Sequence, residues 1–156
     1  MQYRSLTRVT CVAVLAFLVS APTPVASRTR PVRGARITVF KDPNCGCCKN
    51  WIQYLRQHGF DVVSRDTSDL SGVKLTAHVP GQLQSCHTAF ISGYVVEGHV
   101  PAADIERLLR ERPKVAGLAV PGMPAGSPGM EIGSRVDHYD VIAFRRDGTA
   151  QTYARH

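Results

Sequence analysis

Three cysteines lie within four residues, in the segment Cys45-Gly46-Cys47-Cys48. Cys45 and Cys48 have the C-x-x-C spacing that is typical of thiol–disulfide exchange. Cys45 and Cys47 form a C-x-C pair, and Cys47 directly precedes Cys48, a density of thiols that favours a soft metal ion. The segment therefore predicts either a redox pair, with Cys45 and Cys48 as the catalytic residues, or a thiolate metal site.

The elements around this segment are expected to place it at the turn between a strand and a helix. An apolar strand is predicted over 36–41 and a turn over 42–44. A helix is predicted from Cys47, because Cys48, Trp51, Ile52 and Leu55 recur at helical spacing. His58 is expected to cap this helix, with Gly59 as its stop. A second strand over 60–65 completes a β-α-β unit, whose two strands should be parallel.

A thiol at the start of a helix is expected to be reactive. The unpaired backbone N–H groups and the positive end of the helix dipole both stabilise a thiolate and lower its pKa. Since both disulfide exchange and metal binding require the thiolate, this position does not choose between the two chemistries.

The rest of the chain completes an α/β pattern. The further predicted elements are a short helix over 69–78, a hairpin of strands 87–91 and 94–97 with its turn at Ser92-Gly93, a helix over 101–113, a Gly/Pro-rich loop within 114–138, and a final hairpin of strands 141–144 and 149–154. The order β-α-β and then β-β-α matches a thioredoxin-like plan. We therefore expect a central mixed sheet flanked by helices, followed by the loop and a C-terminal hairpin.

In this plan the loop before the third strand lies beside the cysteine turn. Cys86 occupies that loop and should face the Cys45–Cys48 segment although it is distant in sequence. Four converging thiolates could hold one metal ion, or several Cu(I) ions with bridging sulfurs. Soft ligands select Cu(I), with zinc as the less favoured alternative. An iron–sulfur module also uses four cysteines, but it fits poorly with adjacent cysteines and with the export that the N-terminal residues 1–27 predict.

Three further residues are weaker candidates for ligands. His87 is either an additional ligand or proton donor, or a strand-end histidine bonded to the backbone. Met123 and Met130, in the Gly/Pro-rich loop, either supply thioether ligands or pack against the sheet. Structural or solvated roles are expected for His78 and His99.

The first 27 residues have the pattern of a secretory signal peptide. Arg4 and Arg8 precede the apolar run 9–19, and small residues and prolines follow up to Ser27, where we expect cleavage. The apolar run is shorter than the roughly 20 residues of a membrane span, so no stable span is expected after cleavage. Residues 28–35 are predicted to be a flexible tether and 36–156 the folded domain, exported to the periplasm.

Cleavage would remove Cys11 and leave four cysteines. Two disulfides are a poor fit, because a bridge between the adjacent Cys47 and Cys48 would be strained. At most one ordinary bridge is expected, with Cys86 as a partner, so that at least one thiol remains for chemistry.

The basic charge of the chain does not indicate a nucleic-acid partner. The net charge is +7, and it falls to +5 without the two arginines of the signal segment. The cations are scattered, and no basic run alternates with aromatic residues. This distribution favours solubility and weak attraction to anions over nucleic-acid binding.

Four ordered motifs resemble those of one known family. They are Cys45-Gly-Cys-Cys48, Ser85-Cys-His-Thr88, the segment 93–102 (GYVVEGHVPA) and the segment 122–131 (GMPAGSPGME). Together they are similar to the CopG-like family of periplasmic metal-binding proteins, a group long classed as a domain of unknown function, over 36–156. The resemblance implies a thioredoxin-like fold, an exported bacterial protein, copper as the metal and a role in copper resistance.

Carried over by position, the resemblance makes the four cysteines the copper ligands. It leaves two hypotheses open. In one, the protein sequesters Cu(I) or passes it to periplasmic transfer or redox partners, with possible copper redox activity at its thiols. In the other, Cys45 and Cys48 act as a thiol–disulfide oxidoreductase on protein partners. Whether the chain is an enzyme is thus undecided by sequence.

Overall fold

The structure, a computed structural model, describes residues 34–131 and 133–156. The predicted signal peptide and residues 28–33 of the predicted tether lie outside the described residues. The elements are β1 (Arg36–Lys41), α1 (Gly46–Gln57), β2 (Asp61–Asp66), α2 (Leu70–Thr76), the short 3-10 helix η1 (Gly81–Leu83), β3 (His87–Ile91), β4 (Tyr94–Glu97), α3 (Ala102–Glu111), β5 (Gly117–Ala119), β6 (Asp140–Phe144) and β7 (Ala150–Arg155).

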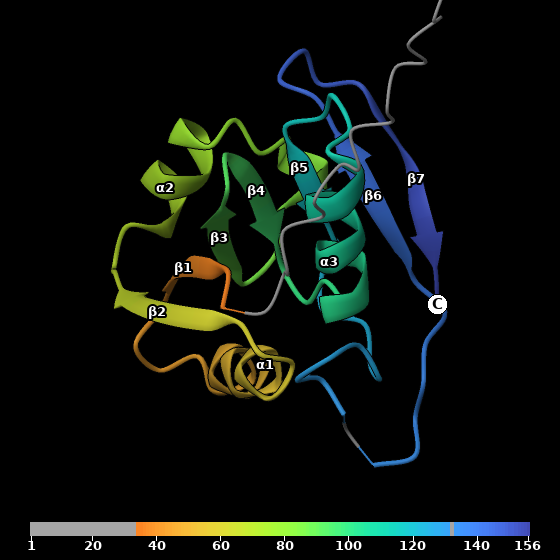
Figure 1. The fold of residues 1–156 in the computed structure, drawn as a ribbon. Coiled ribbons are helices and arrows are strands. Elements are labelled where there is room, and N and C mark those ends of the chain that lie inside the picture. Colours follow the sequence, from red (N-terminus) through yellow and green to blue (C-terminus); the bar gives the residue numbers. More distant parts are fainter. Residues whose placement is uncertain (1–33, 132) are drawn as a thin grey trace, which may run out of the picture.

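The seven strands in the described part of the chain form one mixed sheet in the order β2-β1-β3-β4-β5-β6-β7 (Figure 1). β1 pairs with β2 in parallel, and β4 pairs with β5 in parallel. The other four pairings are antiparallel. The predicted α/β class with a mixed sheet is confirmed, as are the parallel β1–α1–β2 unit, the β3–β4 hairpin and the β6–β7 hairpin.

Side-chain alternation along the strands gives the sheet two apolar faces. The larger core contains Val96 and Leu118 and is covered by α1 and α3, through residues such as Trp51 and Ile105. The smaller core contains Val95 and is covered by the α2–η1 segment. Since successive strand residues point to opposite faces, one strand such as β4 contributes to both cores.

The strand β5 corrects one expectation, because residues 117–119 lie in the segment that the sequence predicted to be a loop. β5 pairs with β4 on one side and with β6 on the other, so it joins the C-terminal hairpin to the rest of the sheet. Gly117 permits this close pairing, since a Cβ there would lie 2.1 Å from the carbonyl oxygen of Val95. A strand of three residues is too short to show a period-two pattern in sequence.

The ends of α1 follow the expected signals. His58 caps the C-terminus, with its Nδ1 atom 2.8 Å from the carbonyl oxygen of Tyr54, and Gly59 follows with a φ of +87°. Of the helices in 34–131 and 133–156, none has the length and apolar character needed to span a membrane.

Candidate metal centre

The cysteine segment forms the start of α1. The turn before it is held by Asp42, whose side chain accepts from the Asn44 N–H at 2.7 Å and whose carbonyl accepts from the Cys45 N–H at 3.1 Å. Cys45 is the N-cap residue, and its Sγ accepts from the Cys48 N–H at 3.3 Å. The predicted position at the positive end of a helix is thereby confirmed, since one of the unpaired N–H groups contacts sulfur directly.

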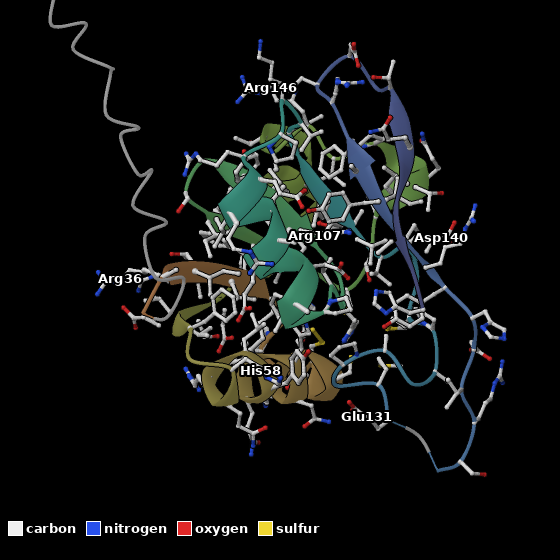
Figure 2. The ribbon with its side chains drawn as sticks, turned by 45° about the vertical axis from the view of Figure 1, so that its right-hand side comes forward. Arg36, His58, Arg107, Glu131, Asp140 and Arg146 are labelled. Atoms are coloured by element: carbon white, nitrogen blue, oxygen red, sulfur yellow. A yellow bond between two sulfur atoms is a disulfide. The ribbon has the colours of Figure 1, made fainter. Side chains whose placement is uncertain are left out.

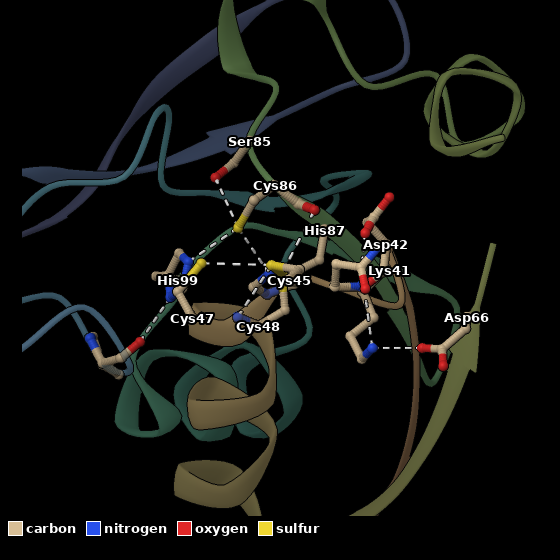
Figure 3. The surroundings of a disulfide bond; sticks show 12 residues. Lys41, Asp42, Cys45, Cys47, Cys48, Asp66, Ser85, Cys86, His87 and His99 are labelled. Carbon is tan, nitrogen blue, oxygen red and sulfur yellow. Dashed lines mark hydrogen bonds and ion pairs between the residues drawn. A yellow bond between two sulfur atoms is a disulfide. The ribbon is translucent and has the colours of Figure 1, made fainter. Parts of the chain in front are cut away.

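Cys45 and Cys48 form a disulfide across the first turn of α1, with a Cα–Cα distance of 5.4 Å (Figure 3). The expectation that a bridge would involve Cys86 is therefore wrong. The N-cap and the third residue of a helix are near enough to satisfy disulfide geometry locally. Among the described residues, Cys47 and Cys86 are free thiols.

Cys86 approaches the segment from the start of β3, as the sequence predicted. The four sulfurs of Cys45, Cys47, Cys48 and Cys86 all lie within 4.8 Å of one another. The Sγ atoms of Cys45 and Cys47 are 3.5 Å apart, and Cys48 Sγ is 3.7 Å from the carbonyl oxygen of Cys86. Cys48 is buried, whereas the other three are half-buried, so that the cluster is shielded but reachable.

Two histidine side chains contact the sulfur of Cys86. Cys86 Sγ lies 3.2 Å from His87 Nδ1 and 3.1 Å from His99 Nε2, and the three form a second group of possible ligands (Figure 3). Both rings are buried. His87 also lies against Trp51, with ring centroids 4.4 Å apart, and its Nε2 has no hydrogen-bond partner among the described residues.

His99 was assigned only a structural or solvated role from sequence, whereas the structure places it against Cys86. The signal that could have found it is the register of the hairpin. Thr88 is opposite Glu97 in the antiparallel β3–β4 pair, and continuing this register by two residues, back from Thr88 and on from Glu97, would bring Cys86 opposite His99. His78, by contrast, is exposed.

Burial determines the protonation state of His87 and His99. It lowers the pKa of His87 well below its ordinary value, with the neighbouring His99 and Lys74 acting in the same direction. Burial also lowers the pKa of His99, against a hydrogen bond to the carbonyl of Pro128. Both rings are therefore neutral near pH 7, which is the form that binds metals.

The pKa of the Cys86 thiol is raised, whereas burial lowers the pKa of the two histidines. Burial first, and then the neighbouring Cys47, raise its pKa to about 12. Cys86 is therefore protonated at neutral pH without a metal, and a metal ion that binds its sulfur must displace that proton.

The Gly/Pro-rich loop contacts the site through its backbone. The carbonyl of Gly122 accepts from the Ser85 hydroxyl, and the carbonyl of Pro128 lies 2.8 Å from His99 Nδ1. Gly129 packs against α1 with φ +83°, where a Cβ would lie 2.6 Å from the backbone nitrogen of Trp51. The loop therefore orients both the Cys86 segment and the His99 ring.

The two loop methionines behave differently from each other. Met123 is 54% exposed, and Met130 is half-buried and donates its N–H to the carbonyl of Ser127 at 2.8 Å. The packing alternative, in which both side chains lie against the sheet, does not describe Met123. A thioether role for either residue stays a prediction.

The donor set fits a soft metal ion. Sulfur from four cysteines favours Cu(I), and zinc and copper also accept imidazole nitrogen. With the Cys45–Cys48 disulfide closed, two thiols and two imidazoles remain. When it is reduced, four thiols are available in the same space, so the redox state of this pair decides the number of thiol ligands.

Known proteins share this arrangement of sequence and fold. A family described as "Protein of unknown function, DUF411" matches residues 83–130. Two solved structures, titled "Copper resistance protein copG", Form 2 and Form 1, are each 51% identical to the chain and cover 80% of it. The matches span 99% and 98% of those chains, with TM-scores of 0.76 and 0.75. No curated protein sequence matches the chain.

Proposed function

Since the chain belongs to the CopG-like DUF411 family, we propose that it is a periplasmic protein of bacterial copper resistance that binds Cu(I) through its clustered thiolates. The cargo is Cu(I), and the proposed ligands are Cys45, Cys47, Cys48 and Cys86, with His87 and His99 beside them. Export rests on the signal-like segment 1–27 of the sequence.

The observation that carries this proposal is the convergence of Cys86 with the cysteine segment of α1. A simple C-x-x-C oxidoreductase needs Cys45 and Cys48 alone. Here Cys47 and Cys86 bring two further sulfurs within 4.8 Å, and Cys86 adds two imidazoles. Such a concentration of soft donors at one place favours metal binding over thiol exchange alone.

The Cys45–Cys48 disulfide supports a redox step as part of the same function. When both residues are thiolates, they can give one electron each to two Cu(II) ions. The products are two Cu(I) ions and the disulfide, so charge and electrons balance. An external thiol reductant would then restore the two thiols by exchange. The alternative function, a thiol–disulfide oxidoreductase acting on protein partners, would use the same pair without copper.

An equilibrium competition against a strong Cu(I) chelator tests the proposal. The chain from residue 28 is reduced under anaerobic conditions and compared with four single variants, in which each clustered cysteine in turn is replaced by serine. We expect tight Cu(I) binding by the parent chain and a loss of affinity in every variant. Cys86→Ser is the most informative of them because Cys86 lies outside the C-x-x-C pair.

The opposite pattern would support the oxidoreductase alternative. In that case Cu(I) binding is weak, and Cys47→Ser and Cys86→Ser change nothing. Cys45→Ser and Cys48→Ser then abolish disulfide exchange with a protein or glutathione substrate. Each variant is measured in both assays, so that neither activity is inferred from the absence of the other.

A further inference from the structure

A buried ion pair lies close to the segment that precedes β3, which carries Cys86. Lys74, on α2, has a side chain that is 7% exposed, and Glu97, at the end of β4, has one that is fully buried. Lys74 Nζ lies 2.5 Å from Glu97 Oε1 and donates to Thr88 Oγ1 at 3.0 Å. Thr88 in turn donates to Glu97 Oε2 at 2.7 Å. None of these side chains belongs to the thiol and imidazole cluster.

The carboxylate of Glu97 also holds the segment that precedes β3. Its Oε1 atom accepts the backbone N–H of Ser85 at 2.7 Å. Ser85 is packed closely as well, since a Cβ on Gly98 would lie 2.6 Å from the Ser85 Cβ. The next residue along the chain is Cys86. The position of its sulfur therefore depends on a backbone that is fixed by a side chain two residues before His99.

A buried ion pair adds little net stability to a folded domain. Buried charges lose their hydration, and replacing a buried pair by apolar residues of similar size is often neutral or stabilising. A carboxylate, however, accepts several hydrogen bonds at once, and here it accepts from three different groups. This points to a role in geometry: one acceptor joins α2, β3 and the Ser85 backbone.

We propose that Glu97, with Lys74 as its buried counter-ion, is a positioning residue that fixes Ser85 and thereby holds the Cys86 sulfur against the Cys45–Cys48 segment. The inference rests on the proposed copper function. A preformed arrangement of ligands avoids the cost of ordering them when the metal binds. Without the carboxylate, the Ser85 N–H has no such acceptor and the Cys86 segment must be ordered by the metal itself.

Two double variants separate this role from simple stability. Lys74→Met/Glu97→Leu removes the ion pair and the acceptor for Ser85. Lys74→Met/Glu97→Gln also removes the ion pair but keeps an amide oxygen that can accept the Ser85 N–H. We expect the leucine variant to bind Cu(I) about tenfold more weakly than the parent chain, the equivalent of one hydrogen bond, and the glutamine variant to recover most of that loss.

Chelator competition on the parent chain and both variants is combined with thermal unfolding of the metal-free proteins. Equal Cu(I) affinities in the two variants would overturn the positioning role. So would affinities that simply follow the melting temperatures. If the parent chain itself binds no Cu(I), the proposed function is wrong. The measurement on the parent chain therefore distinguishes this outcome from a failure of the positioning role alone.

A metal-free measurement on the parent chain covers the case in which the leucine variant does not fold. The Ser85 amide should exchange with solvent deuterium as slowly as the amides of β3, since it donates to a fully buried carboxylate. Exchange as fast as that of an exposed amide without a hydrogen bond would overturn the proposal without any reference to copper.

Discussion

Cys86 is the residue on which the two ligand groups depend, because its sulfur belongs to both. It lies within 4.8 Å of the three sulfurs of the α1 segment and of a ring nitrogen of both His87 and His99. Its pKa of about 12, raised by burial and by Cys47, keeps the sulfur protonated until a metal ion replaces the proton. The protein thus holds a thiol in place with little spontaneous reactivity.

This protonation predicts how Cys86 reacts with an alkylating reagent in the metal-free protein. Below the pKa, the thiolate fraction grows tenfold for each pH unit, so the rate at Cys86 should still be rising at about pH 10, beyond the ordinary thiol pKa of about 8.5. The rate is measured by mass spectrometry of tryptic peptides, since Lys49 and Lys74 place Cys47 and Cys86 on different peptides. A rate that levels off near pH 9 would contradict the shifted pKa.

At this scale the sequence predicted the convergence of Cys86 with the cysteine segment, but not the approach of His99. The first follows from the order of elements, because the loop before the third strand is near the first turn of α1. The second needs the pairing register of a hairpin, which depends on its turn. The sequence predicted the Ser92-Gly93 turn. Extending the strand pairing outward from this turn would have placed Cys86 near His99. The bridge was expected to involve Cys86, but it joins Cys45 and Cys48, the pair with the spacing of disulfide exchange, because the helix N-cap brings these two sulfurs together locally.

At the scale of elements, the site is made where α1, β3 and the loop between β5 and β6 meet. Figure 2 shows this loop, which carries Glu131, close to α1. The loop contacts the site through the backbone of Gly122, Pro128 and Gly129. Its glycines are therefore as relevant to the site as its methionines.

Gly129→Ala tests the packing of this loop on α1. Gly129 has φ +83°, and a Cβ would lie 2.6 Å from the Trp51 nitrogen and 3.0 Å from the Cys47 carbonyl. Gly122→Ala is the matched control, since Gly122 has φ +67° but no atom within 4 Å of such a Cβ. The control should lose about 1–2 kcal/mol for its left-handed backbone, and Gly129→Ala clearly more.

Urea unfolding of the two alanine variants and the parent chain gives these differences. A larger loss at Gly129 also predicts weaker Cu(I) binding, because the backbone of Cys47 would be displaced. Equal losses at the two positions would mean that the loop does not pack against α1 as described.

The elements that sequence predicted best are those with strong periodicity and clear ends. β1, β3 and β4 have the predicted bounds, and α1 begins within one residue of the expected start. β5 was missed because Gly117-Leu118-Ala119 has no pattern of its own, and only the tertiary pairing with β4 and β6 makes it a strand. The contribution of the Gly/Pro-rich loop was equally hidden, since it acts through carbonyls that every sequence possesses.

At the scale of the whole molecule, one sheet with apolar cores on both faces supports a site at the junction of several elements. Copper that joins α1 to the start of β3 would add a cross-link between parts that are distant in sequence. Any ligand that binds only the folded state stabilises it by mass action, by about 4 kcal/mol at a thousand times its dissociation constant.

Thermal unfolding should therefore respond to Cu(I) in the reduced protein. The melting temperature of the parent chain is expected to rise by several degrees with excess Cu(I), as this free energy implies. Cys86→Ser should show a much smaller rise, because the link to β3 is lost. Equal shifts in the two proteins would place the bound copper away from Cys86.

The most direct test of the central claim is copper K-edge X-ray absorption on the reduced chain loaded with Cu(I) and freed of unbound metal. The account predicts the edge of Cu(I) and a first shell dominated by sulfur, with the sulfur contribution reduced in Cys86→Ser. A first shell of nitrogen and oxygen alone, or a spectrum that Cys86→Ser leaves unchanged, would contradict a copper site built from the four converging cysteines.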